Sequence, residues 1–141
     1  MEFENKKILI VEDNENDVEL IKRKFRIREI NTRVFVVNDG EEALDYMHHR
    51  GEFSDPGKYP VPDLIILDIR MPKVNGIEVL REIKSNKMFK SIPVVMLTVS
   101  TLKRDIFDTF DAGGEHYVAK SVAFEKFEST VEPIIMHYLN K

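Results

Sequence analysis

The sequence contains no cysteine, and this absence removes several kinds of chemistry at once. Disulfides, thiolate metal sites, iron–sulfur clusters and cysteine nucleophiles are all excluded. Long apolar runs are absent as well: none approaches the roughly 20 residues that cross a bilayer, and residues 1–5 contain no apolar signal core. These absences favour a cytoplasmic protein that does not enter the membrane.

Basic residues are outnumbered by acidic ones, and the formal net charge is −4. There is no electrostatic reason to expect nucleic acid as a partner, because proteins bind it mainly by neutralising phosphates with Lys and Arg. Hydrophobic residues make up 43% of the chain and charged residues 33%, a balance typical of a folded domain. For 141 residues we expect one domain over 1–141, with its core over about 6–139 and no output domain.

Five short apolar runs alternate with segments of helical periodicity. The first, third and fourth runs are apolar throughout, as expected of central parallel strands that are covered on both faces. The expected strands are Lys7–Val11, Arg33–Val37, Leu64–Leu67, Pro93–Leu97 and His116–Ala119. This order predicts an α/β fold of the flavodoxin-like (βα)5 type, a doubly wound parallel sheet with strand order 2-1-3-4-5.

Three features of the expected helices and loops are distinctive. One helix is expected over about Thr101–Asp111, with the pair Gly113-Gly114 as its C-terminal cap. The last helix has an apolar stripe over 124–138 that contains Pro133, and an interior proline costs about 3 kcal/mol or more, so we expect a bend or a break there. The irregular stretch Arg50–Pro62 is long for a connection and is either a functional loop or an insertion.

Polar residues end four neighbouring strands of the predicted sheet. They are Glu12 and Asp13 after the first strand, Asp68 after the third, Thr98 after the fourth and Lys120 after the fifth. In an open α/β sheet, ligands bind outside the carboxyl ends of the strands, where the strand order reverses. We therefore expect these side chains to converge in one crevice.

The chemistry of this group indicates phosphoryl transfer. Three clustered carboxylates repel one another unless a cation lies between them, and Mg²⁺ prefers such hard oxygen ligands together with phosphate oxygens. Phosphoryl transfer needs little beyond positioning and neutralisation of charge. Asp68 would be the nucleophile, while Lys120 and the hydroxyl of Thr98 would each contact a phosphoryl oxygen.

At these residues the chain resembles response-regulator receiver domains over its whole length. The matching segments are Ile8–Asn14, Asp63–Pro72, Asn75-Gly76, Pro93–Thr98 and Tyr117–Lys120. The resemblance implies a two-component response regulator that a histidine kinase phosphorylates on Asp68 in a Mg²⁺-dependent reaction. Such a protein is not a turnover enzyme, but a phosphoacceptor that catalyses its own phosphorylation and dephosphorylation.

The resemblance also implies a set of metal ligands. Asp13 and Asp68 would bind Mg²⁺ directly, with the backbone carbonyl of Arg70 as a further ligand. Glu12 would act mainly through water. Each residue is given this role because it occupies the matching position in the receiver pattern.

Thr98 and Tyr117 would form a switch pair by the same resemblance. Thr98 would move onto the phosphoryl group, and Tyr117 would swing inward into the space vacated. With no output domain expected, the signal would pass by protein–protein contact, by homodimerisation or by phosphate relay. A dimer patch is suggested by apolar residues expected to be exposed, namely Phe107, Phe110, Ile134, Ile135 and Tyr138.

The long loop that contains Arg50–Phe53 resembles a narrower group of stand-alone receivers. Members of that group pair with phytochrome-type and related sensor kinases. The expected partner is therefore a sensor histidine kinase or a phosphotransfer protein.

Three positions depart from the receiver pattern, and one of them is Arg70, a large, charged residue two positions past Asp68 that is expected to affect kinase or phosphatase access. Ser121 follows Lys120 where receivers usually have a proline joined by a cis bond, so this bond is either trans or held cis at a cost of about 2.5–4 kcal/mol. Val99 follows Thr98 where many receivers have Ala, Gly or Thr, and its branched side chain predicts slow hydrolysis of the phosphorylated form.

Two other classes of protein fit the residues less well. A phosphohydrolase with an aspartyl nucleophile usually has a second carboxylate two residues later, where this chain has Arg70. A nucleotide- or flavin-binding module would have a glycine-rich loop after the first strand, but residues 12–15 are acidic and would repel phosphate without a metal.

Overall fold

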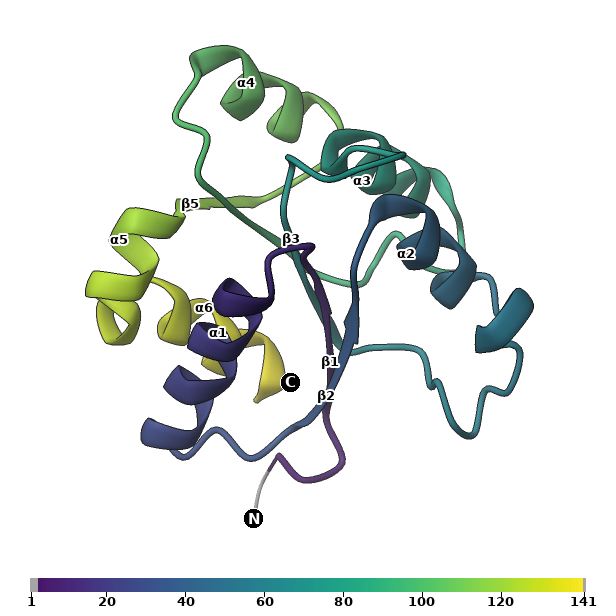
Figure 1. Cartoon of the computed structure of the whole chain (residues 1–141), viewed down its shortest axis with the longest axis horizontal. Helices are drawn as coiled ribbons and strands as arrows, with labels where there is room; N and C mark the ends of the chain where they lie inside the picture. Colours follow the sequence, from purple (N-terminus) through teal and green to yellow (C-terminus); the bar gives the residue numbers. More distant parts are fainter. Residues whose placement is uncertain (1–2, 141) are drawn as a thin grey trace.

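The computed structural model describes residues 3–140 and places a five-stranded parallel sheet at the centre (Figure 1). The strands are β1 (Lys7–Val11), β2 (Arg33–Val37), β3 (Leu64–Leu67), β4 (Val94–Thr98) and β5 (His116–Ala119). Their order is β2-β1-β3-β4-β5. This order confirms the predicted flavodoxin-like sheet, with β4 displaced by one residue from its expected bounds.

Helices cover both faces of the sheet (Figure 1). The α-helices are α1 (Glu15–Ile27), α2 (Gly40–Met47), α3 (Gly76–Ser85), α4 (Lys103–Asp111), α5 (Lys120–Glu125) and α6 (Val131–Leu139), and the short 3-10 helices are η1 (Gly51–Phe53) and η2 (Phe127–Ser129). Helices α1, α5 and α6 lie against one face, and α2, α3 and α4 lie on the other. Across residues 3–140, no helix is long and apolar enough to span a membrane.

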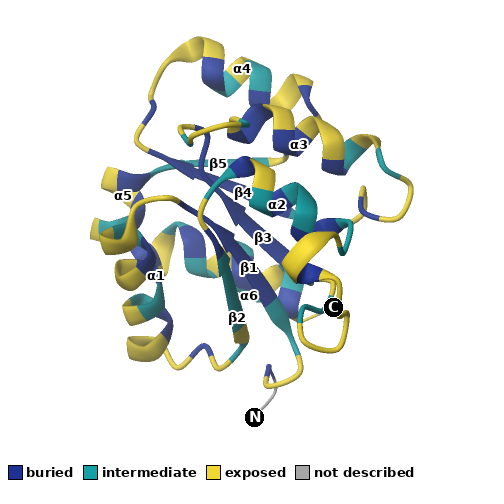
Figure 2. Ribbon diagram, turned by 45° about the vertical axis from the view of Figure 1, so that its right-hand side comes forward, coloured by how far each residue is buried: buried dark blue, intermediate teal, exposed yellow. Residues whose placement is uncertain are grey.

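Each strand sends alternate side chains to two separate cores, because successive side chains of a strand point to opposite faces. On β1, Leu9 and Val11 belong to the core under α2 and α3, whereas Ile8 and Ile10 belong to the core under α1 and α6. Figure 2 shows the central strands as the most deeply buried part of the chain. Every residue of β3 and β4 is buried, whereas the edge strand β5 is only half-buried.

The last helix of the prediction is broken into α5, η2 and α6. The break precedes Pro133, which is the third residue of α6 and lies in its first turn. Proline is tolerated in a first turn, because its missing N–H would have no partner in the helix there. The expected break is therefore present, but Pro133 begins a new helix after it rather than bending one helix in the middle.

Helix α4 begins at Lys103, two residues later than the prediction. The backbone of Leu102 is extended and caps the helix without a side-chain acceptor, so residues 101–102 belong to the preceding loop. At the other end Ala112 is the C-cap, and Gly113 has a φ of 98°, a left-handed conformation that favours glycine. The predicted glycine at the helix C-terminus is confirmed.

The stretch Arg50–Pro62 is held to the domain by aromatic contacts. Phe53 is buried, and its ring lies 5.5 Å from that of Tyr46 on α2 and 5.0 Å from that of Tyr59. The hydroxyl of Tyr46 donates a hydrogen bond of 2.8 Å to the carbonyl of Pro60. These contacts make the stretch an ordered extension of the core beneath α2.

The predicted exposed apolar patch is only partly present. Phe107 and Phe110 on α4 are 67% and 49% exposed. Ile135 is completely buried in the core beneath α6, so its inclusion in the patch was wrong. Ile134 and Tyr138 are half-buried and pack against the same core. The sequence pattern put them on one stripe, but that stripe faces the sheet.

Candidate functional site

The carboxyl ends of β1 and β3 bring two acidic residues into the same rim of the sheet. Parallel pairing aligns Val11 with Leu67, and each is followed by an acidic residue, Glu12 or Asp68. The N–H of Asp68 donates to the carbonyl of Val11 over 3.1 Å, which continues the ladder past the strand ends. Both acidic side chains are nearly inaccessible to solvent, with Glu12 2% and Asp68 3% exposed.

Glu12, Asp13 and Asp68 form a three-carboxylate cluster. One oxygen from each of them lies within 4.8 Å of the others, and Asp13 is the exposed member. Burial raises the pKa of Glu12 to about 7, although the hydrogen bond from Lys120 opposes this, and the charge of Asp68 raises it further. Two buried carboxylates and an exposed one fit a hard divalent cation, which would relieve their repulsion. Of the predicted metal ligands, the three carboxylates are therefore brought together.

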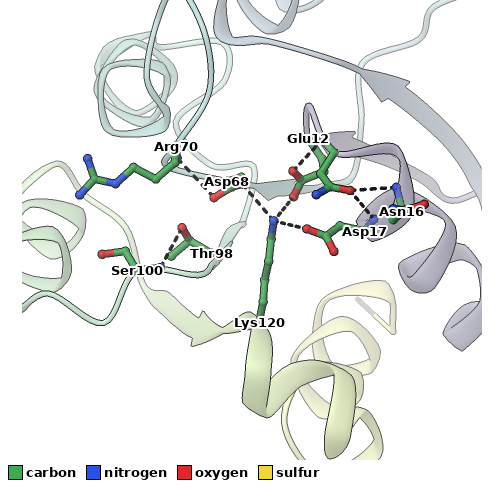
Figure 3. A network of polar contacts seen from close by, with 9 residues as sticks. Glu12, Asn16, Asp17, Asp68, Arg70, Thr98, Ser100 and Lys120 are labelled. Carbon is green, nitrogen blue, oxygen red and sulfur yellow. Dashed lines mark hydrogen bonds and ion pairs between the residues drawn. The ribbon is translucent and has the colours of Figure 1, made fainter.

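Lys120 is the first residue of α5, and its side chain runs into the carboxylate cluster (Figure 3). Its Nζ lies 2.7 Å from Glu12 Oε1, 2.6 Å from Asp17 Oδ2 and 3.1 Å from Asp68 Oδ2. Burial alone would lower the pKa of Lys120, but the hydrogen bonds to Asp17 and Glu12 and the charge of Asp68 outweigh burial and raise it. The ammonium group is thus charged and has a carboxylate partner for each of its three protons.

Asp17 is the member of this group that the sequence analysis missed. It lies in the first turn of α1, whose N-cap Asn14 accepts hydrogen bonds from the N–H groups of Asn16 and Asp17. The first turn of the helix after β1 lies at the same rim as Glu12 (Figure 3). An acidic residue in the first turn of the helix that follows β1 is therefore the sequence signal that would have identified Asp17.

The backbone around Asp68 is held by the start of α3. Gly76 donates its N–H to the carbonyl of Ile69 over 2.9 Å, and a Cβ on Gly76 would lie 2.1 Å from the carbonyl oxygen of Asp68. Only glycine allows this approach. The N–H of Arg70 reaches Asp68 Oδ1 at 3.3 Å, so both carboxylate oxygens of Asp68 face a donor.

The predicted switch pair lies beside the cluster, on β4 and β5. Thr98 is fully buried, and its hydroxyl accepts a hydrogen bond from the N–H of Ser100 over 3.4 Å. The hydroxyl of Tyr117 donates to the carbonyl of Ser100 over 2.7 Å, and burial raises the pKa of Tyr117. Thr98 and Tyr117 therefore meet through the backbone of Ser100.

The side chain of Arg70 points away from the cluster (Figure 3). Its guanidinium lies 2.7 Å from Asp105 Oδ2 in the first turn of α4. The hydroxyl of Ser100 donates to the same carboxylate oxygen. The contacts of the Arg70 side chain with Asp105, and of Asp105 with Ser100, were not predicted from the sequence.

The bond between Lys120 and Ser121 is trans, since no peptide bond within residues 3–140 is cis. Serine lacks the tertiary amide that makes a cis bond inexpensive, so the trans form is the one that its chemistry favours. Even so, the ammonium group of Lys120 contacts Asp68. The departure at Ser121 leaves the lysine within reach of the site.

Comparison of the sequence with known proteins shows which family has these residues in this arrangement. Residues 8–132 match the model of the response regulator receiver domain. The chain is 38% identical over 133 residues to the probable methanogenesis regulatory protein FilR2 of Methanothrix harundinacea, an alignment that covers 94% of this chain and 83% of FilR2. It is 36% identical over 116 residues to the response regulator Rcp1 of Synechocystis, with 82% and 77% covered.

Solved structures show the same architecture. The phosphorylated cyanobacterial phytochrome response regulator RcpA superimposes with a TM-score of 0.85 and 38% identity, over 96% of this chain and 94% of that one. The Mn²⁺-bound form of Rcp1 superimposes with a TM-score of 0.75 and 31% identity, over 84% and 91%. Similarity in sequence and in three-dimensional structure thus extends over nearly all of the chain.

Proposed function

The chain belongs to the response regulator receiver family of two-component systems, and on that premise we propose that it is a switch phosphorylated on Asp68 by a histidine kinase. The observation that supports Asp68 as the phosphoacceptor is its place among Glu12, Asp13 and Lys120 at the rim of the sheet. Receiver domains are in general signalling domains without turnover chemistry. The proposed chemistry is accordingly confined to the gain and loss of one phosphoryl group.

In the proposed reaction a carboxylate oxygen of Asp68 attacks the phosphorus of phosphohistidine. An O–P bond forms, the P–N bond breaks, and the histidine leaves with its electron pair and takes up a proton. Lys120 already donates to Asp68 Oδ2, so the same ammonium group would pair with a phosphoryl oxygen. The hydroxyl of Thr98 would donate to another.

Mg²⁺ is the proposed cation of the three-carboxylate cluster. Asp13, Asp68 and the carbonyl of Arg70 would hold it, with Glu12 acting through water. Its chemistry there is to neutralise charge on the phosphoryl oxygens. Hydrolysis of the phosphorylated form at the same residues would return the protein to its starting state without a second enzyme.

Phosphorylation would act on the surface formed by α4 and β5. A phosphoryl group adds about −1.5 to −2 of charge and three acceptor oxygens. Thr98 is the one residue of β4 that carries a hydroxyl. Movement of Thr98 would shift Ser100, whose carbonyl accepts the hydrogen bond of Tyr117. The hydroxyl of Ser100 also donates to Asp105 on α4, so the same movement would reach both β5 and α4.

Mass spectrometry of the intact protein tests the phosphoacceptor. The native chain and Asp68→Asn are incubated with acetyl phosphate, with Mg²⁺ or with EDTA. We expect a single phosphoryl adduct that requires both Mg²⁺ and Asp68. Catalytic release of phosphate without an adduct would favour a hydrolase, and no reaction at all would indicate a receiver that works without phosphorylation.

The proposed partner is a phytochrome-type sensor kinase or a phosphotransfer protein. Support comes from RcpA, described as a phytochrome response regulator, and from its similarity over nearly the whole chain. Output would pass by protein contact or phosphate relay. Homodimerisation is the further proposal, through Phe107 and Phe110. Light scattering that shows a monomer in both phosphorylation states would reject the dimer.

A further inference from the structure

Asp17 makes the shortest of the three contacts to the ammonium group of Lys120. The distance from Lys120 Nζ is 2.6 Å to Asp17, against 2.7 Å to Glu12 and 3.1 Å to Asp68. We infer that Asp17 is a positioning residue for the phosphoryl transfer: it holds Lys120 so that one proton points at Asp68. This inference rests on the proposed function and adds a residue to its site.

Asp17 differs from the other partners of Lys120 because it lies outside the three-carboxylate cluster. Glu12 and Asp68 are both members of the cluster and would share their charge with a bound cation. A carboxylate whose charge is drawn to a cation holds an ammonium group less strongly. Asp17 alone would keep its full charge for Lys120 once the cluster is occupied.

The anchoring is directional as well as electrostatic. An ammonium group has three protons, and hydrogen bonds to charged acceptors are the strong ones. With two protons held by Asp17 and Glu12, the third is aimed at Asp68. Lys120 stands on a flexible four-carbon stem, so without Asp17 it would lose side-chain order that the reaction needs.

Asp17 also has an ordinary structural role, which the test must separate from positioning. An acidic residue in the first turn of a helix is stabilised by the helix dipole, and α1 carries two of them, Glu15 and Asp17. Glu15 is exposed and lies in the same turn. Glu15→Gln therefore removes the same charge from the same turn and is the matched control for Asp17→Asn.

The experiment measures the rate of adduct formation with saturating acetyl phosphate and Mg²⁺. Asp17→Asn is expected to slow phosphorylation about tenfold, the scale of one charge-assisted hydrogen bond, and Asp17→Glu to restore part of the rate. Glu15→Gln should keep the native rate. In a Lys120→Met background, Asp17→Asn should have no further effect, because its partner is already gone.

A binding measurement gives a second readout that does not depend on the reaction. Beryllofluoride mimics a phosphoryl group on a carboxylate, and NMR titration in Mg²⁺ reports its affinity. We expect Asp17→Asn to weaken beryllofluoride binding about tenfold and Glu15→Gln to leave it unchanged. Thermal unfolding confirms that each variant is folded.

The outcomes separate this inference from the proposed function. If the native chain forms no adduct, the proposed function is wrong and the role of Asp17 falls with it. If the native chain reacts and Asp17→Asn reacts equally fast, only the role of Asp17 is wrong. An equal loss in Glu15→Gln, or an undiminished effect in the Lys120→Met background, would also overturn it.

Discussion

The guanidinium of Arg70 and the carboxylate of Asp105 lie 2.7 Å apart and join the loop after Asp68 to the first turn of α4. The Asp105 side chain is 12% exposed and also accepts the hydroxyl of Ser100, whereas the Arg70 side chain is 55% exposed. The carbonyl of Ser100 in turn accepts the hydroxyl of Tyr117. One carboxylate therefore ties together the phosphoacceptor loop, the switch region and α4.

Replacing Asp105 is expected to cost more stability than replacing Arg70. Asp105→Ala leaves the buried hydroxyl of Ser100 without its acceptor and should lower the free energy of unfolding by about 1–3 kcal/mol. Arg70→Ala removes only a partly exposed ion pair and should cost under about 1 kcal/mol. Urea unfolding measures both, with Asp108→Ala on the same helix as the control. Equal losses from Asp105→Ala and Arg70→Ala would show that the ion pair, and not Ser100, is the main tie.

Gly76→Ala is expected to damage both the fold and the site. The new Cβ would lie 2.1 Å from the carbonyl oxygen of Asp68, so α3 or the Asp68 backbone must move. We expect a loss of about 1–3 kcal/mol in the free energy of unfolding and slower phosphorylation. Gly57→Ala is the control, since its Cβ would meet only an exposed side-chain oxygen of Asp55 at 3.2 Å. Native stability and rate in Gly76→Ala would contradict the argument.

Val99→Ala is expected to shorten the lifetime of the phosphorylated form. Val99 is 67% exposed and directly follows the buried Thr98, the residue proposed to contact the phosphoryl group. Removal of two methyl groups should admit water more freely, and we expect hydrolysis to become a few times faster. Loss of the adduct with time, followed by intact mass after removal of acetyl phosphate, measures this. An unchanged lifetime would show that Val99 does not limit hydrolysis of the phosphorylated form.

The stability of the protein is expected to fall in mild acid through His116. Burial lowers the pKa of His116 below its ordinary value of 6.5, although Glu115 opposes the shift, and its Nε2 lies 2.7 Å from the hydroxyl of Tyr138. The unfolded chain therefore binds the proton more readily than the folded one. This contribution to stability is complete above about pH 6.5 and is lost as the pH falls through the lower folded pKa. Urea unfolding at about pH 7 and about pH 5 should show a smaller loss for His116→Gln than for the native chain.

Much of the fold was predictable from the sequence because its signals are local. A parallel strand covered on both faces must be apolar along its length, and Leu64–Leu67 meets that condition without help from the rest of the chain. Four of the five strand ranges were correct to the residue, and the order 2-1-3-4-5 followed from the repeated alternation of strand and helix. The break near Pro133 was foreseen for the same local reason, the missing N–H of proline.

The errors in the sequence-based prediction arose where packing between different segments decides the structure. Ile135 was expected to be exposed. It is buried instead, because the new helix α6, which begins at Val131, directs the Ile135 side chain toward the sheet. Helix α4 starts at Lys103 because residues 101–102 continue the loop in which Ser100 is held by Asp105 and Tyr117. Residue types alone do not reveal either contact, because each depends on how α4 and β5 pack beside the loop.

The sequence by itself determined which residues stand at the carboxyl ends of the strands, and with them Glu12, Asp13, Asp68, Thr98 and Lys120. That follows from strand periodicity and parallel order, which need only local patterns. Only the tertiary structure decided which charged side chains contact one another. It placed Asp17 against Lys120 and Asp105 against Arg70, because the packing of α1 and α4 on the sheet sets which charges meet.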